Sequence, residues 1–486
     1  MARLIAGVGR DVDAKAFVSG KDGVQWISSL DPLFAEVVKL GDFDGEAGKS
    51  LVVYGSRLAR RAVLAGAGDE EWYGWVEALR IGVAAAVRAV VGLKNVKSVA
   101  VSVEPRLVER ALGEGGGSEW VYEQAMVAGD MAAYRFVLKK EDEGGGLEEI
   151  VFPEAPSASA GSAEAIALGV KLARDVANMP ASRMNPEGIE EEARRIAGKY
   201  GLTLRVLHRG ELESLGMGGV LAVGMGSSVE PRLIVLEYDG GGPSLAVVGK
   251  TVTFDSGGLD IKPSQAMLEM KYDKSGGAAA LGAAVAAALL KLPVKLTVLL
   301  PAVENMPSGS SYKPLDVIEM YNGLRVEVGN TDAEGRLTLA DALAYAAEKY
   351  KPKALLDLAT LTGAAVIALG NHAAALMSNN EELARLVEKA AWRAGEPVWK
   401  LPMWKVYGKQ LESKVADINN IGGRAAGPIT AAKFLEKFVG ETPWVHLDIA
   451  GVAWVQEKGP WKPYYQQGAT GWGVRTIIEA ARLLAA

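Results

Sequence analysis

The chain has 486 residues, of which 49% are hydrophobic and 23% are charged, and its formal net charge is -6 at pH 7. This length predicts two or three domains, and the apolar content suffices for a large core. The acidic balance argues against nucleic-acid and anionic-membrane partners. The absence of cysteine excludes disulfides, cysteine-ligated metal centres and cysteine nucleophiles, and it fits a reducing compartment.

Residues 1–152 alternate strand-like runs with helix-like runs. Residues 51–55 and 98–103 are rich in Val and are predicted strands, and residues 75–91 form a predicted helix. This alternation is typical of an α/β domain with a largely parallel sheet.

A change in composition marks the expected end of the first domain. Residues 153–162 are rich in Pro, Ala and Ser and contain no large apolar side chain, which is typical of a linker. A connecting helix is expected to follow and to end at residue 177, because Pro180 lies shortly beyond it. The predicted division is an N-terminal domain at 1–152, a linker and connecting helix at 153–177, and a larger domain at 178–486.

The larger domain again alternates strands and helices. Its first helix is predicted at residues 186–200, with Asn185 as N-cap and Pro186 in the first position. The further predicted strands are residues 244–249, 294–300, 354–358 and 444–447, and the further predicted helices are residues 278–290, 338–350, 428–438 and 476–484. The segment 399–404, which carries two Trp residues, fits either a core or an interface. No short-period repeat is present, which argues against a solenoid or a propeller.

Neither a signal peptide nor a membrane span is predicted. Residues 1–6 lack the long apolar stretch of a signal peptide. The most apolar region, residues 276–292, is short for a spanning helix, and Asp273 and Lys291 flank or interrupt it. We therefore expect a buried core helix there and a cytoplasmic protein without a membrane partner.

The histidines do not suggest a histidine-rich metal site. The chain has three, His208, His372 and His446, and no predicted helix carries two of them at metal-ligand spacing. His446 lies in a strand-like run and is predicted to be a buried core residue. Any metal site must therefore be built mainly from carboxylates.

Several charged residues lie at predicted strand ends and in glycine-rich loops. The strand at 244–249 runs into Lys250, and Asp255 follows within Asp255-Ser256-Gly257-Gly258. Asp273 precedes the Ala-rich helix, and Asp332 and Glu334 are two apart, so in an extended segment they point the same way. Four carboxylates supply enough charge for two divalent ions about 4 Å apart. The alternative is that each carboxylate belongs to a solvated turn, since composition does not show that these loops meet.

Taken together, these segments resemble the leucyl aminopeptidase family, also called cytosol aminopeptidases. Residues 330–337, Asn-Thr-Asp-Ala-Glu-Gly-Arg-Leu, match that family's signature octapeptide. Further segments similar to those of the family are residues 178–180, 253–263, 270–273, 359–364, 420–424 and 446–451. The resemblance covers roughly residues 160–486, and the N-terminal part fits by size and class. It implies two domains, an N-terminal α/β domain with a variable sheet and a larger catalytic domain with a central mixed sheet flanked by helices.

The resemblance implies a two-metal aminopeptidase that releases N-terminal residues, preferably Leu and other apolar ones, through a metal-activated water. Asp255 and Glu334 are implied to bridge two ions. The complete implied ligand set is Lys250, Asp255, Asp273, Asp332 and Glu334. Zinc or manganese are the ions expected first, with magnesium or cobalt as alternatives.

Two further roles and a substrate pocket follow from the same resemblance. Lys262 is implied to hydrogen-bond the tetrahedral intermediate, and Arg336 to hold a bicarbonate ion that accepts a proton from the water. The implied substrate-binding residues are Met270, Asn330, Thr360, Gly363 and Ala450. The resemblance also implies a homohexamer that acts on peptides in the cytoplasm. A few residues depart from the commonest family pattern, among them Lys274, which follows Asp273 at a position that is often apolar.

Other enzyme classes fit less well. The run Asp255 to Gly258 looks like the serine loop of trypsin-like proteases, but no suitable histidine segment precedes it, so Ser256 is not expected to be a nucleophile. A two-metal phosphoesterase usually mixes histidines into its site, and they are missing here. A DNA-binding assembly that has lost catalysis is opposed by the complete set of charged site residues and by the acidic balance.

Overall fold

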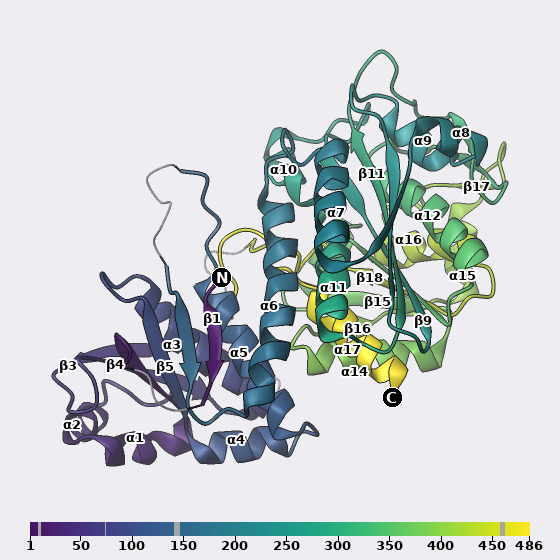
Figure 1. The fold of residues 1–486 in the computed structure, drawn as a ribbon. Coiled ribbons are helices and arrows are strands. Elements are labelled where there is room, and N and C mark those ends of the chain that lie inside the picture. Colours follow the sequence, from purple (N-terminus) through teal and green to yellow (C-terminus); the bar gives the residue numbers. More distant parts are fainter. Residues whose placement is uncertain (8–10, 73, 140–145, 457–461) are drawn as a thin grey trace. The chain divides into compact units, whose positions relative to one another are not determined.

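The computed structural model describes residues 1–7, 11–72, 74–139, 146–456 and 462–486, which fold into two compact units. The first unit comprises Met1–Lys171 together with Glu457–Gln467. The second comprises Leu172–Gln456 and Gly468–Ala486. Each unit is built on its own sheet (Figure 1), as expected for a two-domain α/β protein.

The first unit contains a six-stranded sheet in the order β1-β6-β5-β2-β4-β3. The strands are β1 (Arg3–Ala6), β2 (Ala14–Gly20), β3 (Ser50–Tyr54), β4 (Arg61–Gly68), β5 (Ser98–Val103) and β6 (Glu149–Phe152). Every neighbouring pair is parallel except β3 and β4. The prediction of a largely parallel sheet is therefore confirmed.

Helices pack on the strands of the first unit. The long helix α3 (Trp75–Val91) contacts β2, β4 and the helix α5 (Ser118–Ala133). Phe17 of β2 and Phe34 of α2 (Pro32–Leu40) pack together at ring centroids 5.5 Å apart in a separate apolar cluster. The predicted helix at 75–91 has these same bounds in the structure.

A late segment of the chain belongs to this first unit. Lys462 Nζ lies 2.9 Å from Glu77 Oε1, and Arg80 Nη1 lies 3.0 Å from Glu77 Oε2. Tyr464 donates its hydroxyl to the same carboxylate. All four side chains are buried, so Glu77 of α3 holds the segment 462–467 through charge-assisted hydrogen bonds.

Two helices lead into the second unit. The helix α6 (Ser157–Asn178) begins within the stretch expected to be a linker, whose Ala and Ser residues are compatible with a helix. The helix α7 (Pro186–Tyr200) begins as predicted, since the Asn185 side chain accepts a hydrogen bond from Gly188 N over 2.9 Å.

The second unit is built on a nine-stranded sheet in the order β16-β15-β18-β14-β9-β11-β8-β7, with β10 paired to β11. The strands are β7 (Thr203–Leu207), β8 (Arg232–Asp239), β9 (Ser244–Gly249), β10 (Thr251–Asp255), β11 (Lys295–Asn305), β14 (Ala354–Ala359), β15 (Ala374–Ser378), β16 (Val398–Lys400) and β18 (Trp444–Asp448). Parallel pairs at the centre combine with antiparallel pairs β11–β8, β8–β7 and β15–β18. The expected central mixed sheet is present.

Helices cover both faces of this sheet (Figure 1). The helices α11 (Ser275–Leu290) and α12 (Gly335–Tyr350) contact the same three central strands, β9, β11 and β14, from opposite sides. Every residue of α11 from Ser275 to Ala287 is buried, which confirms the prediction of a core helix. Among the described residues, no helix is long and apolar enough to cross a membrane.

Candidate active site

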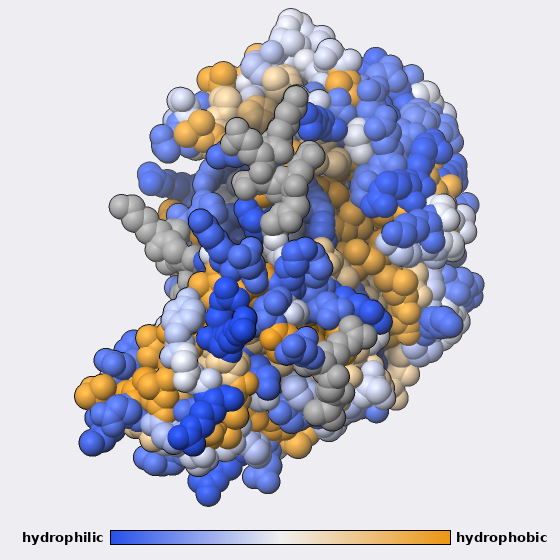
Figure 2. Space-filling model, turned by 60° about the vertical axis from the view of Figure 1, so that its left-hand side comes forward, coloured by the Kyte–Doolittle hydropathy of each residue, from blue (hydrophilic) through white to orange (hydrophobic). Residues whose placement is uncertain are grey.

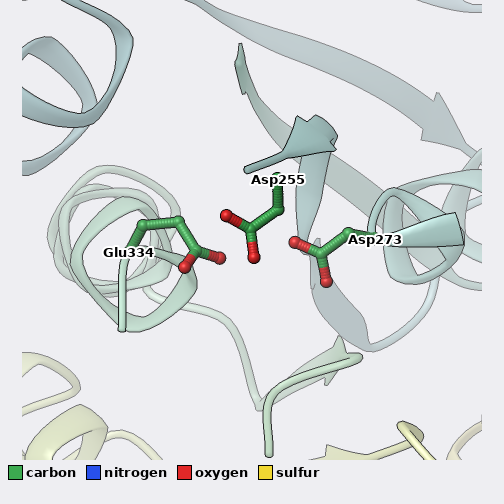
Figure 3. Close-up of side chains that lie close together, drawn as sticks. All are labelled: Asp255, Asp273 and Glu334. Carbon is green, nitrogen blue, oxygen red and sulfur yellow. The ribbon is translucent and has the colours of Figure 1, made fainter. Parts of the chain in front are cut away.

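Three carboxylates from separate segments meet beside the central strands. Asp255 ends β10, Asp273 lies just before α11, and Glu334 is the residue before α12. Figure 3 shows the three side chains pointing toward one another, and each offers an oxygen within 4.8 Å of the others. All three are buried, so their mutual repulsion is weakly screened and must be compensated by cations.

Lys250 supplies one such cation directly after β9. Its Nζ lies 2.8 Å from Asp273 Oδ1 and 2.9 Å from Glu334 Oε1, and it donates to Thr360 O over 3.0 Å. Burial lowers the pKa of Lys250, but the carboxylates of Asp273 and Glu334 outweigh burial and raise it above its ordinary value. Gly335 makes room for this side chain, since a Cβ there would lie 2.3 Å from Lys250 Cε.

Lys262 supplies the second cation, from the loop after β10. Its Nζ lies 2.8 Å from Asp255 Oδ2 and 2.5 Å from Asp332 Oδ1. Burial again lowers the lysine pKa, and the surrounding carboxylates raise it further than burial lowers it. Asp332 therefore joins the group through Lys262, and its side chain is the most open of the four carboxylates, at 35% exposure.

The carboxylates carry more negative charge than the two lysines neutralise. Burial, and then the nearby Glu334, raise the pKa of Asp255 to about 6. Burial likewise raises the pKa of Asp273, whose Oδ2 is buried without a hydrogen-bond partner among the described residues. The pKa of Glu334 is lowered, because Lys250 and Lys262 outweigh its burial. Hard carboxylate oxygens with an unsatisfied buried atom are a donor set that fits divalent ions.

Arg336 lies in the first turn of α12 beside this group. Its Nη1 donates to Asn420 O over 2.6 Å, while its buried Nε has no hydrogen-bond partner among the residues described. Burial lowers the pKa of Arg336 to about 10, so the guanidinium remains charged at neutral pH. An arginine with an unused donor and a planar fork can bind a small oxyanion.

The charged group opens into a pocket of about 700 Å³. Four of the five residues predicted to bind substrate line it, namely Met270, Thr360, Gly363 and Ala450. Asn330 lies outside this lining. Its side chain instead accepts a hydrogen bond from Asp332 N over 2.6 Å, which makes it a support for Asp332.

Further residues around the pocket were not predicted from the sequence. Trp454 and Glu269 line it, and Trp454 Nε1 donates to Glu269 Oε2 over 2.9 Å. Asn305, at the end of β11, donates to Asp255 Oδ1 over 2.9 Å and to Thr331 O over 3.1 Å. Asn305 and Asp255 are register partners of two paired strands, a relationship that the linear sequence does not reveal.

His446 is a core residue, as predicted. It is fully buried in β18, and its Nδ1 lies 2.6 Å from Asp357 Oδ1 on the neighbouring strand β14. The Asp357 carboxylate also accepts a hydrogen bond from Trp444 Nε1 over 2.7 Å. This pairing satisfies the carboxylate inside the sheet.

Comparison with known families and relatives identifies the family of the chain. Residues 171–478 match the catalytic domain of the cytosol aminopeptidase family, and residues 20–142 match its N-terminal domain. A probable cytosol aminopeptidase of Roseiflexus castenholzii is 41% identical over 474 residues, which cover 93% of this chain and 94% of that one. One of Syntrophotalea carbinolica is 52% identical over 329 residues, which cover 67% of this chain and 65% of that protein.

Solved structures show the same architecture. The cytosol aminopeptidase of Coxiella burnetii is 32% identical, with a TM-score of 0.84 and 99% of both chains covered. The bottromycin maturation enzyme BotP in complex with Mn is also 32% identical, with a TM-score of 0.85 over 98% of this chain and 100% of that one. The chain therefore belongs to the cytosol aminopeptidase family and is an aminopeptidase, a hydrolase of peptide bonds.

Proposed function

We propose that the protein is a two-metal aminopeptidase that prefers peptides with Leu or another apolar residue at the N-terminus. The observation that supports this most is the convergence of Asp255, Asp273 and Glu334, with Asp273 Oδ2 buried and unpaired among the described residues. The Mn complex of the structural relative BotP is consistent with it.

The residues that would hold the ions are those of the converged group. The proposed ligands are Lys250, Asp255, Asp273, Asp332 and Glu334. Lys250 and Lys262 occupy the space between the carboxylates as cations, so metal binding requires Lys250 to bind as a neutral amine, a state that neighbouring dications favour. When bound, divalent ions supply an activated water and a polarised carbonyl, and we propose zinc or manganese as the ions.

Two cationic side chains complete the proposed chemistry. Lys262 is part of the pocket lining, and its ammonium stabilises the negative charge that develops on the carbonyl oxygen of the scissile bond. Arg336 also lines the pocket and would hold a bicarbonate ion, which would supply a base for the proton of the water. A free α-amino group of the substrate would bind at the ions as a neutral amine, which confines cleavage to the first peptide bond.

The pocket beside the charged group is suited to an apolar side chain. Met270, Gly363 and Ala450 line it together with the indole of Trp454. Two of these are small, so they leave room for a branched aliphatic group such as that of Leu. Thr360, whose hydroxyl donates to Asp273 Oδ1 over 2.8 Å, links this pocket to the charged group.

We further propose that the protein acts as a cytoplasmic homohexamer. Large apolar side chains are exposed on the second unit, including Ile367 at 89%, Trp399 at 62% and Trp404 at 66%. Exposure of Trp399 and Trp404 supports an interface for these two side chains, whereas Leu401 and Met403 of the same segment pack against the core. Apolar patches interrupt the hydrophilic surface on the face drawn in Figure 2. We also propose that the N-terminal domain ends at residue 152 and that the catalytic domain begins at residue 178.

Product analysis tests the direction of cleavage. The protein is incubated with a peptide that begins with Leu and with the same peptide acetylated at its N-terminus. Free Leu is expected only from the unblocked peptide, because the site is proposed to bind the α-amine. Equal cleavage of both peptides, or cleavage at an internal bond, would contradict an aminopeptidase of this kind.

A further inference from the structure

The turn that carries Asp273 is attached to the end of helix α6 by two lysine side chains. Lys271 Nζ donates to Asn178 O over 3.0 Å. Lys274 Nζ donates to Met179 O over 3.2 Å and also to Lys271 O over 2.5 Å. Two amines from one turn therefore converge on consecutive carbonyl groups where α6 ends.

The two lysines differ in burial. Lys274 is completely buried, whereas the Lys271 side chain remains partly accessible to water. Lys274 forms no ion pair among the described residues, so its hydrogen bonds are those to the carbonyl oxygens. A helix end offers unsatisfied carbonyl groups and a partial negative charge, both of which suit an amine donor. A lysine amine donates N–H in either protonation state, so the attachment does not depend on its charge.

The other side of the same turn is also fixed. The Tyr272 ring stacks on the indole of Trp454 at a centroid distance of 5.5 Å and an interplanar angle of 14°. Asn178, whose carbonyl accepts from Lys271, accepts a second hydrogen bond at its Oδ1 from Ala469 N over 2.9 Å. Ala469 in turn forms an isolated β-bridge with Trp454. The end of α6, the turn and the Trp454 wall of the pocket are thus tied into one unit.

We propose that Lys274 is a positioning residue, which holds the Asp273 turn against the end of α6 and thereby sets the metal affinity of the site that uses Asp273. The inference rests on the proposed two-metal function. Asp273 meets Thr360 and Lys250 through Oδ1, over 2.8 Å each, and both contacts depend on the place of the turn that carries Asp273. Groups that orient metal ligands typically change metal affinity about 10–100-fold when removed.

Lys274→Met tests this role, since Met has a similar length and removes every donated hydrogen bond. Metal-free wild type and variant are titrated with Mn²⁺ by calorimetry. We expect two binding steps in wild type and a loss of about 10–100-fold in one step of the variant, with the other step retained. Lys271→Met is expected to have a smaller effect, because water can replace a partly exposed amine. Lys295→Met, an exposed change in the same unit, is the control.

The direction of the change in Mn²⁺ affinity separates a positioning role of Lys274 from simple charge repulsion between Lys274 and the ions. If Lys274 acted only as a positive charge beside the ions, its removal would tighten Mn²⁺ binding. Unchanged or tighter binding in Lys274→Met therefore overturns the proposal. Should that variant fail to fold, Lys274→Leu, which likewise removes the donated hydrogen bonds, decides by the same criterion. Absence of Mn²⁺, Zn²⁺, Mg²⁺ and Co²⁺ binding by wild type would instead overturn the proposed function.

A kinetic measurement completes the test. With saturating Mn²⁺, the displaced Asp273 turn is expected to lower kcat for Leu-p-nitroanilide more than it changes KM, because the apolar pocket residues stay in place. A merely structural role would lower the melting temperature of the metal-free protein and leave kcat and Mn²⁺ affinity at the wild-type values. That outcome would also overturn the proposal.

Discussion

Asn305 Nδ2 donates a hydrogen bond to Asp255 Oδ1 over 2.9 Å. The two residues are register partners on the neighbouring strands β11 and β10. Gly257 N donates to the same oxygen over 2.9 Å. These two donors fix the carboxylate and leave Oδ2 facing Lys262 and the rest of the charged group. The orientation of the central carboxylate is therefore set by main-chain and amide donors outside the proposed ligand set.

Replacing Asn305 by Ala is expected to weaken metal binding. The variant loses the donors to Asp255 Oδ1 and to Thr331 O, so Asp255 can rotate away from its position. We expect Mn²⁺ affinity to fall about 10–100-fold, measured by calorimetric titration of the metal-free protein. Asn322→Ala, which changes an exposed amide, is the matched control. Wild-type affinity in Asn305→Ala would show that Asp255 does not need this support.

Arg336→Met is expected to slow the reaction while leaving substrate binding largely intact. Arg336 lines the pocket with an Nε that is unpaired among the described residues, and the proposed bicarbonate ion acts as a base there. Loss of a general base typically costs at least about 100-fold, so kcat should fall by that order with little change in KM. The same variant should lose the stimulation by bicarbonate that wild type is expected to show. Equal stimulation of both proteins would contradict the role of Arg336.

The cluster around Glu77 predicts a pH-dependent contribution to stability. Burial raises the pKa of Glu77, but Lys462 and Arg80 outweigh it and bring the pKa down to about 2, from 4.5. A lowered carboxyl pKa stabilises the fold above the unfolded-state value and loses this contribution as pH falls toward the folded-state value. At pH 7 the Glu77→Gln variant should therefore be less stable by about 3 kcal/mol.

Urea unfolding at two pH values measures this contribution. The difference between wild type and Glu77→Gln should shrink to less than half on going from pH 7 to pH 3, because pH 3 lies inside the window between the two pKa values. Glu109→Gln, an exposed change in the same unit, should show little difference at either pH. A difference that stays constant between pH 7 and pH 3 would contradict the assigned charge state of Glu77.

The exposed tryptophans predict self-association. Trp399 and Trp404 expose 62% and 66% of their surface, and burying them in an interface removes apolar area from water. Light scattering after size-exclusion chromatography should give a mass about six times the 51.2 kDa of one chain. Trp404→Asp should dissociate this assembly at least in part, whereas Lys199→Asp should not. A monomeric wild-type protein would rule out the homohexamer.

Regular alternation and composition predicted the main elements well, because their apolar faces are local properties of the chain. The bounds of α3, α7, β5 and β9 are those expected from the sequence. The helices α11 and α12 begin three residues earlier than predicted, at Ser275 and Gly335. Glycine is a poor helix former, yet Gly277 belongs to the first turn of α11. This turn lies so close to the end of β9 that a Cβ at Gly249 would lie 2.5 Å from Gly277 Cα. Close packing thus overrides local propensity there.

Long-range partners could not be predicted from the sequence. β11 continues through Pro301 to Asn305, because antiparallel and parallel neighbours hold it on both sides, and the predicted strand stopped at residue 300. The support of Asp255 by Asn305 depends on that extension. The attachment of Lys462 to Glu77 joins positions that lie about four fifths of the chain length apart. The charged site residues, by contrast, were recognisable because the octapeptide at 330–337 and its companion segments form a known pattern.

Restoration of activity to the chelated protein tests the central claim most directly. Hydrolysis of Leu-p-nitroanilide is followed while Mn²⁺ or Zn²⁺ is added to metal-free wild type and to Asp255→Ala, which removes the carboxylate at the centre of the group. Activity should return in wild type as two ions bind per chain and should remain at background in the variant. Full activity of the chelated wild type, or metal-restored activity in Asp255→Ala equal to wild type, would contradict a two-metal site built around Asp255.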